Sequence, residues 1–187
     1  HDALPISYTY AINTVRGEAV AAAVEYGLWV RRNMENQDGG KELIREGFKH
    51  MPELQAMLDK RLQDPSVAVR AMYGRYLPWI HLLDEVWTTT NKPSIFPKGG
   101  FKSPLYEAAW NTYVLYVPSY NEMLGFLSDQ YTEAVDDIKN TPYSEKDTRD
   151  PQRKLAEHLL ALYWRGIIPL DSPLLVAFWR DADDSLR

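Results

Sequence analysis

The chain contains no cysteine among its 187 residues. That absence excludes a disulfide framework, cysteine-ligated zinc or iron–sulfur sites, and a thiol nucleophile. The sequence also lacks any apolar run that approaches the roughly 18 residues a membrane-spanning helix needs. Together these two absences favour a reducing, cytoplasmic location.

The chain also has no strong excess of positive or negative charge. The 21 Lys and Arg residues are interspersed with 26 Asp and Glu residues, which gives a formal net charge of −5. No global field therefore attracts nucleic acid or an anionic membrane surface. Partners must be sought in local patches, and the 6 Trp and 12 Tyr residues supply side chains for packed layers or contact surfaces.

The strongest pattern that the sequence does contain is helical, and it is clearest at residues 64–70, Asp-Pro-Ser-Val-Ala-Val-Arg. Asp64 predicts an N-terminal cap, because its side chain can accept free backbone N–H groups, and Pro65 suits the first helical position. An apolar face follows at helical spacing from Val69 to Ile80. Pro78 predicts a kink or break near Leu77.

Similar start signals and apolar stripes predict helices along the rest of the chain, about seven to nine in all. Expected N-terminal caps are Asn13 or Thr14, Ser103, Ser119 with Glu122 as a capping box, Asp150 and Ser172. In the first helix, to about residue 33, the expected stripe is Val15, Ala19, Ala22, Tyr26 and Trp29, widened by Val20, Val24 and Leu28, so we expect the helix to be covered on both sides. Further helices are expected over 41–49, 52–63, 79–87, 103–117 and 119–140, with a loop over 88–102. No strand-period run competes, so the fold class predicted is all-α.

The stretch 64–70 resembles the HEAT repeat, in which an Asp-Pro start is followed by Val-Arg. The resemblance implies an irregular right-handed α-solenoid, in which Asp64 caps its helix and Arg70 joins a ladder of polar bonds between repeats. Val15-Arg16 echoes Val69-Arg70 early in another helix. Helix pairs in such solenoids hide their apolar faces by stacking on neighbouring pairs.

A second resemblance concerns the segments 12–19 and 162–166, Ile-Asn-Thr-Val-Arg-Gly-Glu-Ala and Leu-Tyr-Trp-Arg-Gly. They look like the helical C-terminal regions of large bacterial proteins, some of which carry NTPase modules of conflict or defence systems. Residues 1–7 resemble a translated sequencing adapter, which suggests assembly from environmental reads. We therefore expect residues 1–7 to be non-native or disordered, and 8–187 to form a single helical-repeat segment, open at both ends.

Two segments suggest ligand chemistry, and each has a structural interpretation that we favour. Residues 98–103, Lys-Gly-Gly-Phe-Lys-Ser, are similar to a phosphate-binding loop, but Phe101 replaces the glycine before the lysine and no strand precedes it. Asp136 and Asp137 with Asn140 suggest a carboxylate site for Mg²⁺, yet they fall opposite the apolar stripe of their helix. We expect a flexible loop in the first case and a solvated face in the second.

Histidine and basic residues offer two more candidates. His158 lies on an apolar face, which favours a buried, hydrogen-bonded histidine over a metal ligand or general base. The basic pairs Arg31-Arg32 and Lys60-Arg61 could contact phosphates, but basic residues near helix C-termini usually complement the helix dipole.

These patterns predict a non-catalytic scaffold or recognition segment of a larger cytoplasmic bacterial protein. We expect no catalytic residue, cofactor or metal. Structural roles are expected for Arg16, Asp64, Arg70, Ser103, Ser119 and Asp150. The expected partners are other domains of the same parent chain and other proteins, with no membrane. Two alternatives stay open: an all-α enzyme that uses carboxylates such as Asp136 and Asp137, and a nucleic-acid-binding helical repeat.

Overall fold

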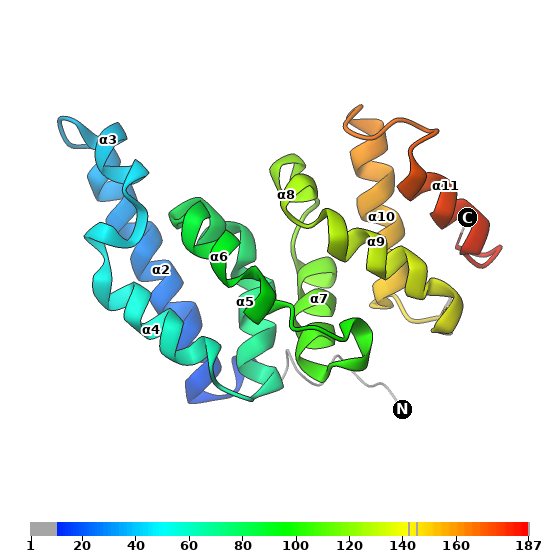
Figure 1. Cartoon of the computed structure of the whole chain (residues 1–187), viewed down its shortest axis with the longest axis horizontal. Coiled ribbons are helices and arrows are strands. Elements are labelled where there is room, and N and C mark those ends of the chain that lie inside the picture. Colours follow the sequence, from blue (N-terminus) through cyan, green and yellow to red (C-terminus); the bar gives the residue numbers. More distant parts are fainter. Residues whose placement is uncertain (1–10, 142, 145, 187) are drawn as a thin grey trace. The chain divides into compact units, whose positions relative to one another are not determined.

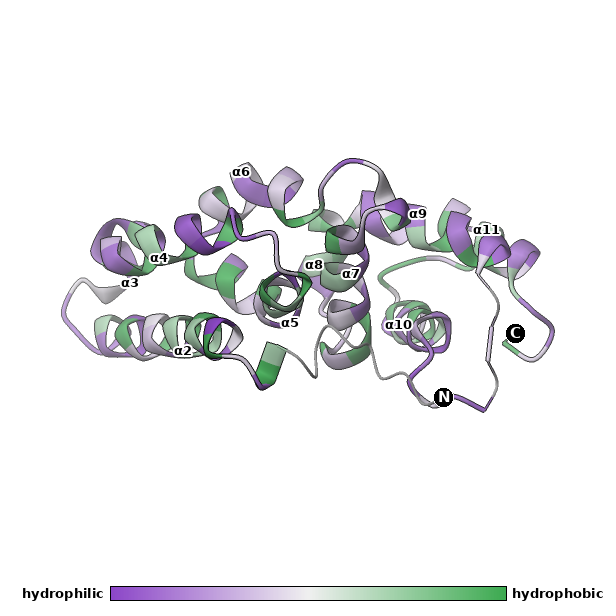
Figure 2. Cartoon of the chain, turned by 90° about the horizontal axis from the view of Figure 1, so that it is seen from below, coloured by the Kyte–Doolittle hydropathy of each residue, from purple (hydrophilic) through white to green (hydrophobic). Residues whose placement is uncertain are grey.

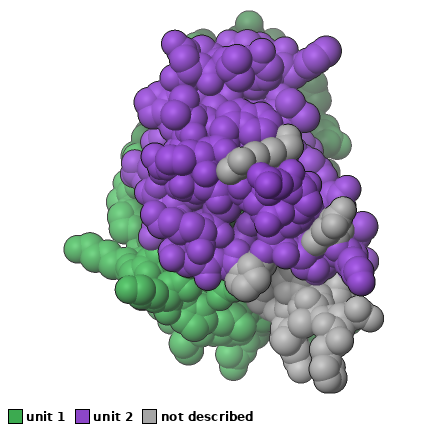
Figure 3. Space-filling view, turned by 90° about the vertical axis from the view of Figure 1, so that its right-hand side faces the viewer, with its two compact units in different colours: residues 1–113 green, residues 114–187 purple. Residues whose placement is uncertain are grey.

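A computed structural model describes residues 11–141, 143–144 and 146–186. All regular secondary structure in these residues is helical, which confirms the predicted all-α class (Figure 1). The chain divides into two compact units, residues 1–113 and 114–187, with the boundary inside one helix (Figure 3). The expected adapter-derived segment, residues 1–7, lies outside the described residues. No described helix has the length and apolar character that crossing a membrane requires.

The first unit is built around two long helices, α2 and α5, which pack along one another. α5 also packs against α6, and α4 packs against both α2 and α5. The elements of this unit are α2 (Val15–Glu35), α3 (Gly40–Arg45), η1 (Gly47–His50), α4 (Pro52–Leu62), α5 (Val67–Leu83), α6 (Glu85–Ile95), η2 (Gly100–Lys102) and most of α7 (Pro104–Tyr116).

Helix α2 begins as predicted but buries a different face. Thr14 is its N-cap and accepts a hydrogen bond from the backbone N–H of Gly17 at 3.1 Å. Burial of the main predicted stripe is wrong, because Val15, Ala22, Tyr26 and Trp29 are exposed. Val20 and Val24, which were predicted to widen the stripe, are buried. The buried face is instead Gly17, Val20, Ala21, Val24, Gly27 and Met34. Figure 2 accordingly shows hydrophobic and hydrophilic residues mixed along α2.

Close approach at Gly27 explains why the small-residue face of α2 turns inward. A Cβ atom at Gly27 would lie 2.5 Å from Leu54 Cδ2 and 2.9 Å from Leu83 Cδ1. Leucines from α4 and α5 therefore fill the space that a side chain at this position would occupy. The low helix propensity of glycine, up to about 1 kcal/mol, is offset by this packing.

Two expectations for α5 are corrected by the structure. Asp64 is not the N-cap, because the helix starts at Val67 with Ser66 as the cap residue and without a side-chain cap bond. Pro78 does not break the helix, which continues to Leu83, while a kink near Leu77 stays a prediction. Pro78 is buried in the middle of α5, where the contacts with α2 and α6 hold the helix together despite the missing backbone donor.

The predicted loop over 88–102 is also wrong, since its first half, residues 88–95, belongs to α6. Asp84 starts this helix by accepting the backbone N–H of Trp87 at 2.7 Å, and its other carboxylate oxygen accepts the N–H of Phe48 at 2.9 Å. The Trp87 ring contacts Phe48 edge-on, and its Nε1 donates to Asp59 at 2.8 Å. These tertiary contacts outweigh the weak helix propensity of the Thr-rich and Pro-containing sequence.

The second unit contains the end of α7 and four further α-helices. They are α8 (Asn121–Phe126), α9 (Ser128–Asp137), α10 (Pro151–Trp164) and α11 (Pro173–Asp181), with η3 (Ile138–Asn140) after α9. Asp150 and Ser172 cap α10 and α11 as predicted, through the N–H groups of Gln152 and Leu175. α9 packs against α11.

The predicted continuous helix over 119–140 is divided, and Ser119 is not its N-cap. α8 starts at Asn121 with Tyr120 as the cap residue and no side-chain cap bond. Leu127, at φ −105° and ψ 19°, departs from helical geometry and separates α8 from α9. Ser119 instead accepts hydrogen bonds from Arg165 at the end of α10, through its carbonyl oxygen and through Oγ at 2.9 Å. This contact to a distant helix competes with a local capping box.

Candidate recognition surfaces and their supporting polar residues

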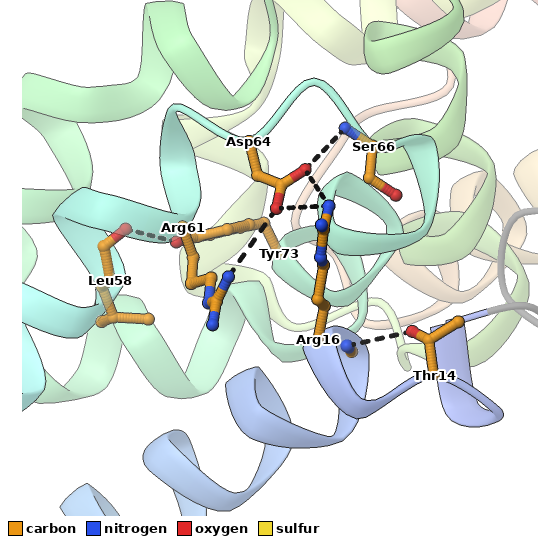
Figure 4. A network of polar contacts seen from close by, with 8 residues as sticks. Thr14, Arg16, Leu58, Arg61, Asp64, Ser66 and Tyr73 are labelled. Carbon is orange, nitrogen blue, oxygen red and sulfur yellow. Dashed lines mark hydrogen bonds and ion pairs between the residues drawn. The ribbon is translucent and has the colours of Figure 1, made fainter.

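Asp64 joins three helices of the first unit at one carboxylate (Figure 4). It accepts the backbone N–H of Ser66 at 3.0 Å, just before α5. Arg16 of α2 approaches it at 3.3 Å and Arg61 of α4 at 3.8 Å. Its side chain is only 9% exposed, so these contacts replace much of its hydration. Asp64 therefore connects these three helices and is not the cap of α5.

Arg70 is buried, as the sequence suggested, with 4% of its surface exposed. Its Nη2 donates to the carbonyl oxygen of Leu62 at the end of α4, at 2.8 Å. The guanidinium carbon lies 6.0 Å from the centre of the Tyr73 ring, and Tyr73 donates to the carbonyl oxygen of Leu58 at 2.6 Å. Burial lowers the pKa of Arg70 and raises that of Tyr73. These bonds connect α5 to the helix before it.

Arg16 and Arg70 do not occupy equivalent environments, although the sequence echo between them suggested repetition. Val69 is fully buried, whereas Val15 is 88% exposed. Arg16 is exposed and reaches across to Asp64, while Arg70 is enclosed beside Tyr73. The polar ladder between repeats stays a prediction.

The exposed face of α2 carries a stripe of apolar side chains, which we call the α2 stripe: Val15, Ala22, Tyr26 and Trp29. Their spacing of seven, four and three residues places them on one side of the helix. Tyr26 and Trp29 stack with ring centres 6.4 Å apart, and Tyr26 donates to Glu53 of α4 at 2.5 Å. Trp29 is nevertheless 60% exposed. The α2 stripe is thus an apolar surface that faces water, and the ring stacking and the bond to Glu53 fix its aromatic side chains.

The second unit has a cavity of about 540 Å³ between α10 and α11. Its inner surface is formed by the buried side chains of Leu159, Leu175 and Phe178. The remaining lining residues are Tyr143, Arg153, Ala156, Glu157, Leu160, Tyr163, Leu170, Trp179, Ser185 and Leu186. The lining is mostly apolar, with charge contributed by one arginine and one glutamate.

His158 is a buried, hydrogen-bonded residue of α10, as predicted. Its Nε2 faces the carbonyl oxygen of Val117 at 2.9 Å and must carry the proton, so its Nδ1 accepts from the Tyr131 hydroxyl at 2.9 Å. Burial lowers the pKa of His158 to about 4. The neutral ring links α10 to α9 and to the residue just after α7.

The other predicted sites do not assemble catalytic geometry. Asp137 accepts hydrogen bonds from Asn140 and Thr141 at the end of α9, and Asp136 is exposed. Within the described ranges, no group of three or more His, Asp or Glu side chains is arranged to hold a metal ion. The segment 98–103 follows helix α6 and contains η2, so it lacks the preceding strand of a phosphate-binding loop.

The remaining predicted residues have structural positions. The carbonyl oxygen of Ser103 accepts the N–H of Glu107 in the first turn of α7, and a cap through its hydroxyl stays a prediction. Asp150 accepts two backbone N–H groups, from Gln152 at 2.8 Å and from Ser144 at 3.1 Å. Of the basic pairs, Arg31 is bound to the carbonyl oxygen of Leu82 and to Glu35.

Sequence reasoning missed three features that matter for these surfaces. Asp84 had a readable signal, since it precedes Glu85, two apolar residues and a run of threonines, but the Pro and Gly residues that follow hid it. Arg165 and the cavity beside α10 depend on contacts between distant segments, for which the sequence gives no local signal.

No protein-family model, no curated protein and no solved structure matches this chain.

Proposed function

We propose that this chain is a non-catalytic, HEAT-like scaffold or recognition segment of a larger cytoplasmic bacterial protein. Within that class, the resemblance of residues 12–19 and 162–166 favours the sensor or interaction region of an NTPase-type conflict or defence protein. The solenoid arrangement belongs to this proposal, and it is supported by helices that pack in pairs and by the junctions at Asp64 and Arg70.

The α2 stripe is the observation that carries the proposal. A helix 21 residues long turns Val15, Ala22, Tyr26 and Trp29 to water, although burying an aromatic side chain is worth about 1.5–3 kcal/mol. Exposed apolar surface of this extent is typical of an interface. The stripe is linear and runs along one helix, so its best-fitting occupant is an apolar helix face of a protein partner.

The residues in and beside the α2 stripe favour the same occupant. Ala19 and Ala22 leave shallow positions one turn apart, whereas Tyr26 and Trp29 project on the next two turns. Such alternation of small and large residues lets a facing helix interdigitate. Glu18 near one end and Arg32 near the other are exposed and could pair with charges that flank an apolar stripe on the partner.

Self-association of the isolated chain tests the proposal, because the α2 stripe of a second copy is itself an apolar helix face. Sedimentation velocity over a range of concentrations should show reversible association. Trp29→Glu should weaken it by about tenfold or more, since a charge must then be buried.

Trp164→Glu is the matched control, because Trp164 is 84% exposed but lies in the other unit. It should leave the association unchanged. A chain that stays monomeric at the highest attainable concentration, or one that responds equally to both substitutions, would overturn the assignment of the α2 stripe as the recognition surface.

A further inference from the structure

The cavity of the second unit has the size and lining of a small-molecule site. Its volume of about 540 Å³ falls in the range of about 300–1,000 Å³ that ligand pockets occupy. Leu159, Leu175 and Phe178 form a buried apolar interior. Tyr143 and Trp179 add aromatic surface at its edge, which suits a flat or elongated apolar group.

Charge in the lining is unequally compensated. Glu157 is held by Lys154 at 2.6 Å, while its distance to Arg153 is 3.8 Å. A distance of 3.8 Å is too long for a hydrogen bond. Glu157 therefore neutralises the charge of Lys154 more effectively than the charge of Arg153. Lys154 is not part of the cavity lining, whereas Arg153 is. The guanidinium of Arg153 is therefore the charge that the cavity offers to a ligand.

We propose that this cavity binds a small amphipathic anion, with an aromatic or aliphatic body between α10 and α11 and a carboxylate or sulfonate head at Arg153. A guanidinium binds such heads through paired N–H donors. The apolar body gains affinity by leaving water against Leu175 and Phe178. This site lies in the second unit and goes beyond the recognition function proposed for α2 in the first.

Two dyes that differ in a single group test the charge requirement. Anilinonaphthalene sulfonate carries an anionic head, and N-phenylnaphthylamine has the same ring system without it. Fluorescence titration of the intact chain should give a dissociation constant about tenfold lower for the sulfonate, because only the sulfonate pairs with Arg153.

Variants in α10 should shift the affinity for the sulfonate in opposite directions. Arg153→Gln should remove its advantage over the neutral dye, and Glu157→Gln should strengthen its binding by removing a like charge. Arg149→Gln is the control, because it removes the same charge from an exposed residue outside the lining. Circular dichroism of each variant verifies that α10 remains folded.

A substitution in the apolar lining locates the dyes. Leu170 is 60% exposed and lines the cavity, so Leu170→Asp should weaken both dyes without unfolding the unit. Equal affinity for the two dyes, or sulfonate binding that responds alike to Arg153→Gln and Arg149→Gln, would overturn the proposal. The first of these results would identify the cavity as a purely apolar docking groove.

Discussion

Arg70 and His158 are both buried polar residues, but their hydrogen-bonding capacity is met to different degrees. His158 uses both ring nitrogens, toward Tyr131 and Val117. Arg70 uses Nη2, while its Nε and Nη1 have no hydrogen-bond partner within the described part of the protein. A buried guanidinium that is only partly satisfied costs desolvation energy without full compensation. The two residues should therefore respond differently to substitution.

For Arg70, an apolar replacement of similar length should be tolerated. Arg70→Met keeps an unbranched side chain beside Tyr73 and removes the desolvated charge, so we expect a free energy of unfolding within about 1 kcal/mol of the wild type. Arg70→Ala also leaves a cavity and should cost about 2–3 kcal/mol more. Urea denaturation measures both values. Equal destabilisation by Met and Ala would show that the charge itself holds α5 to α4.

For His158, the expected signature is a loss of stability in acid. The folded-state pKa is lowered to about 4 from an ordinary value of 6.5, so the unfolded chain takes up a proton first as the pH falls. Stability is then complete above the ordinary value and declines as the pH falls toward about 4, by an amount on the order of 3 kcal/mol.

His158→Gln provides the comparison for this pH dependence, because glutamine does not titrate. The difference in unfolding free energy between the wild type and the variant should narrow between about pH 6.5 and about pH 4. A difference that stays constant across this interval would mean that His158 is not kept neutral by burial.

At the level of single helices, close approach between neighbours determines which face of a helix is buried, and the sequence pattern alone did not determine it. The starts of α2, α10 and α11 were predictable because Thr14, Asp150 and Ser172 act within a few residues. The buried side of α2 was not, because either of two apolar faces fitted the helical period. The close approach of Leu54 and Leu83 at Gly27 selects the face that neighbouring helices can reach.

Gly74 in α5 gives the sharpest test of that argument. A Cβ atom there would lie 2.0 Å from the carbonyl oxygen of Ala109 in α7, a backbone atom that cannot rotate away. Gly74→Ala should therefore cost on the order of 1–3 kcal/mol, despite the better helix propensity of alanine.

Gly125→Ala is the matched change in α8, where nothing lies within 4 Å of the added Cβ. This variant should gain about 0.5–1 kcal/mol, because only propensity acts. Thermal unfolding of both variants gives the comparison. A Gly74→Ala variant as stable as Gly125→Ala would contradict the close approach of α5 and α7.

At the scale of the whole molecule, the all-α class followed from the sequence, but the candidate sites did not. The residues singled out, Asp64 and Arg70 above all, prove to be junctions between helices. The surfaces proposed for function are defined by exposure at the α2 stripe and by the cavity beside α10. Both surfaces depend on which helices pack together, and a single sequence does not show which helices are in contact.

Helix α2 buries its small-residue face and leaves the α2 stripe in water, and the proposed recognition function depends on this arrangement. The absence of cysteine provides a clean background for testing it with single thiols. Ala22 is exposed and Val24, two residues later, is fully buried. Ala22→Cys and Val24→Cys should therefore report on opposite sides of the same helix.

The measurement is the rate at which a thiol reagent labels each variant, at a concentration low enough for the chain to be monomeric. The Ala22→Cys variant should react as fast as it does in the urea-unfolded chain. The Val24→Cys variant should react more slowly by on the order of 100-fold or more, because labelling of a buried thiol requires local opening. Equally slow labelling of the Ala22→Cys and Val24→Cys variants would contradict this arrangement of α2, since the proposed recognition surface would then be part of the core.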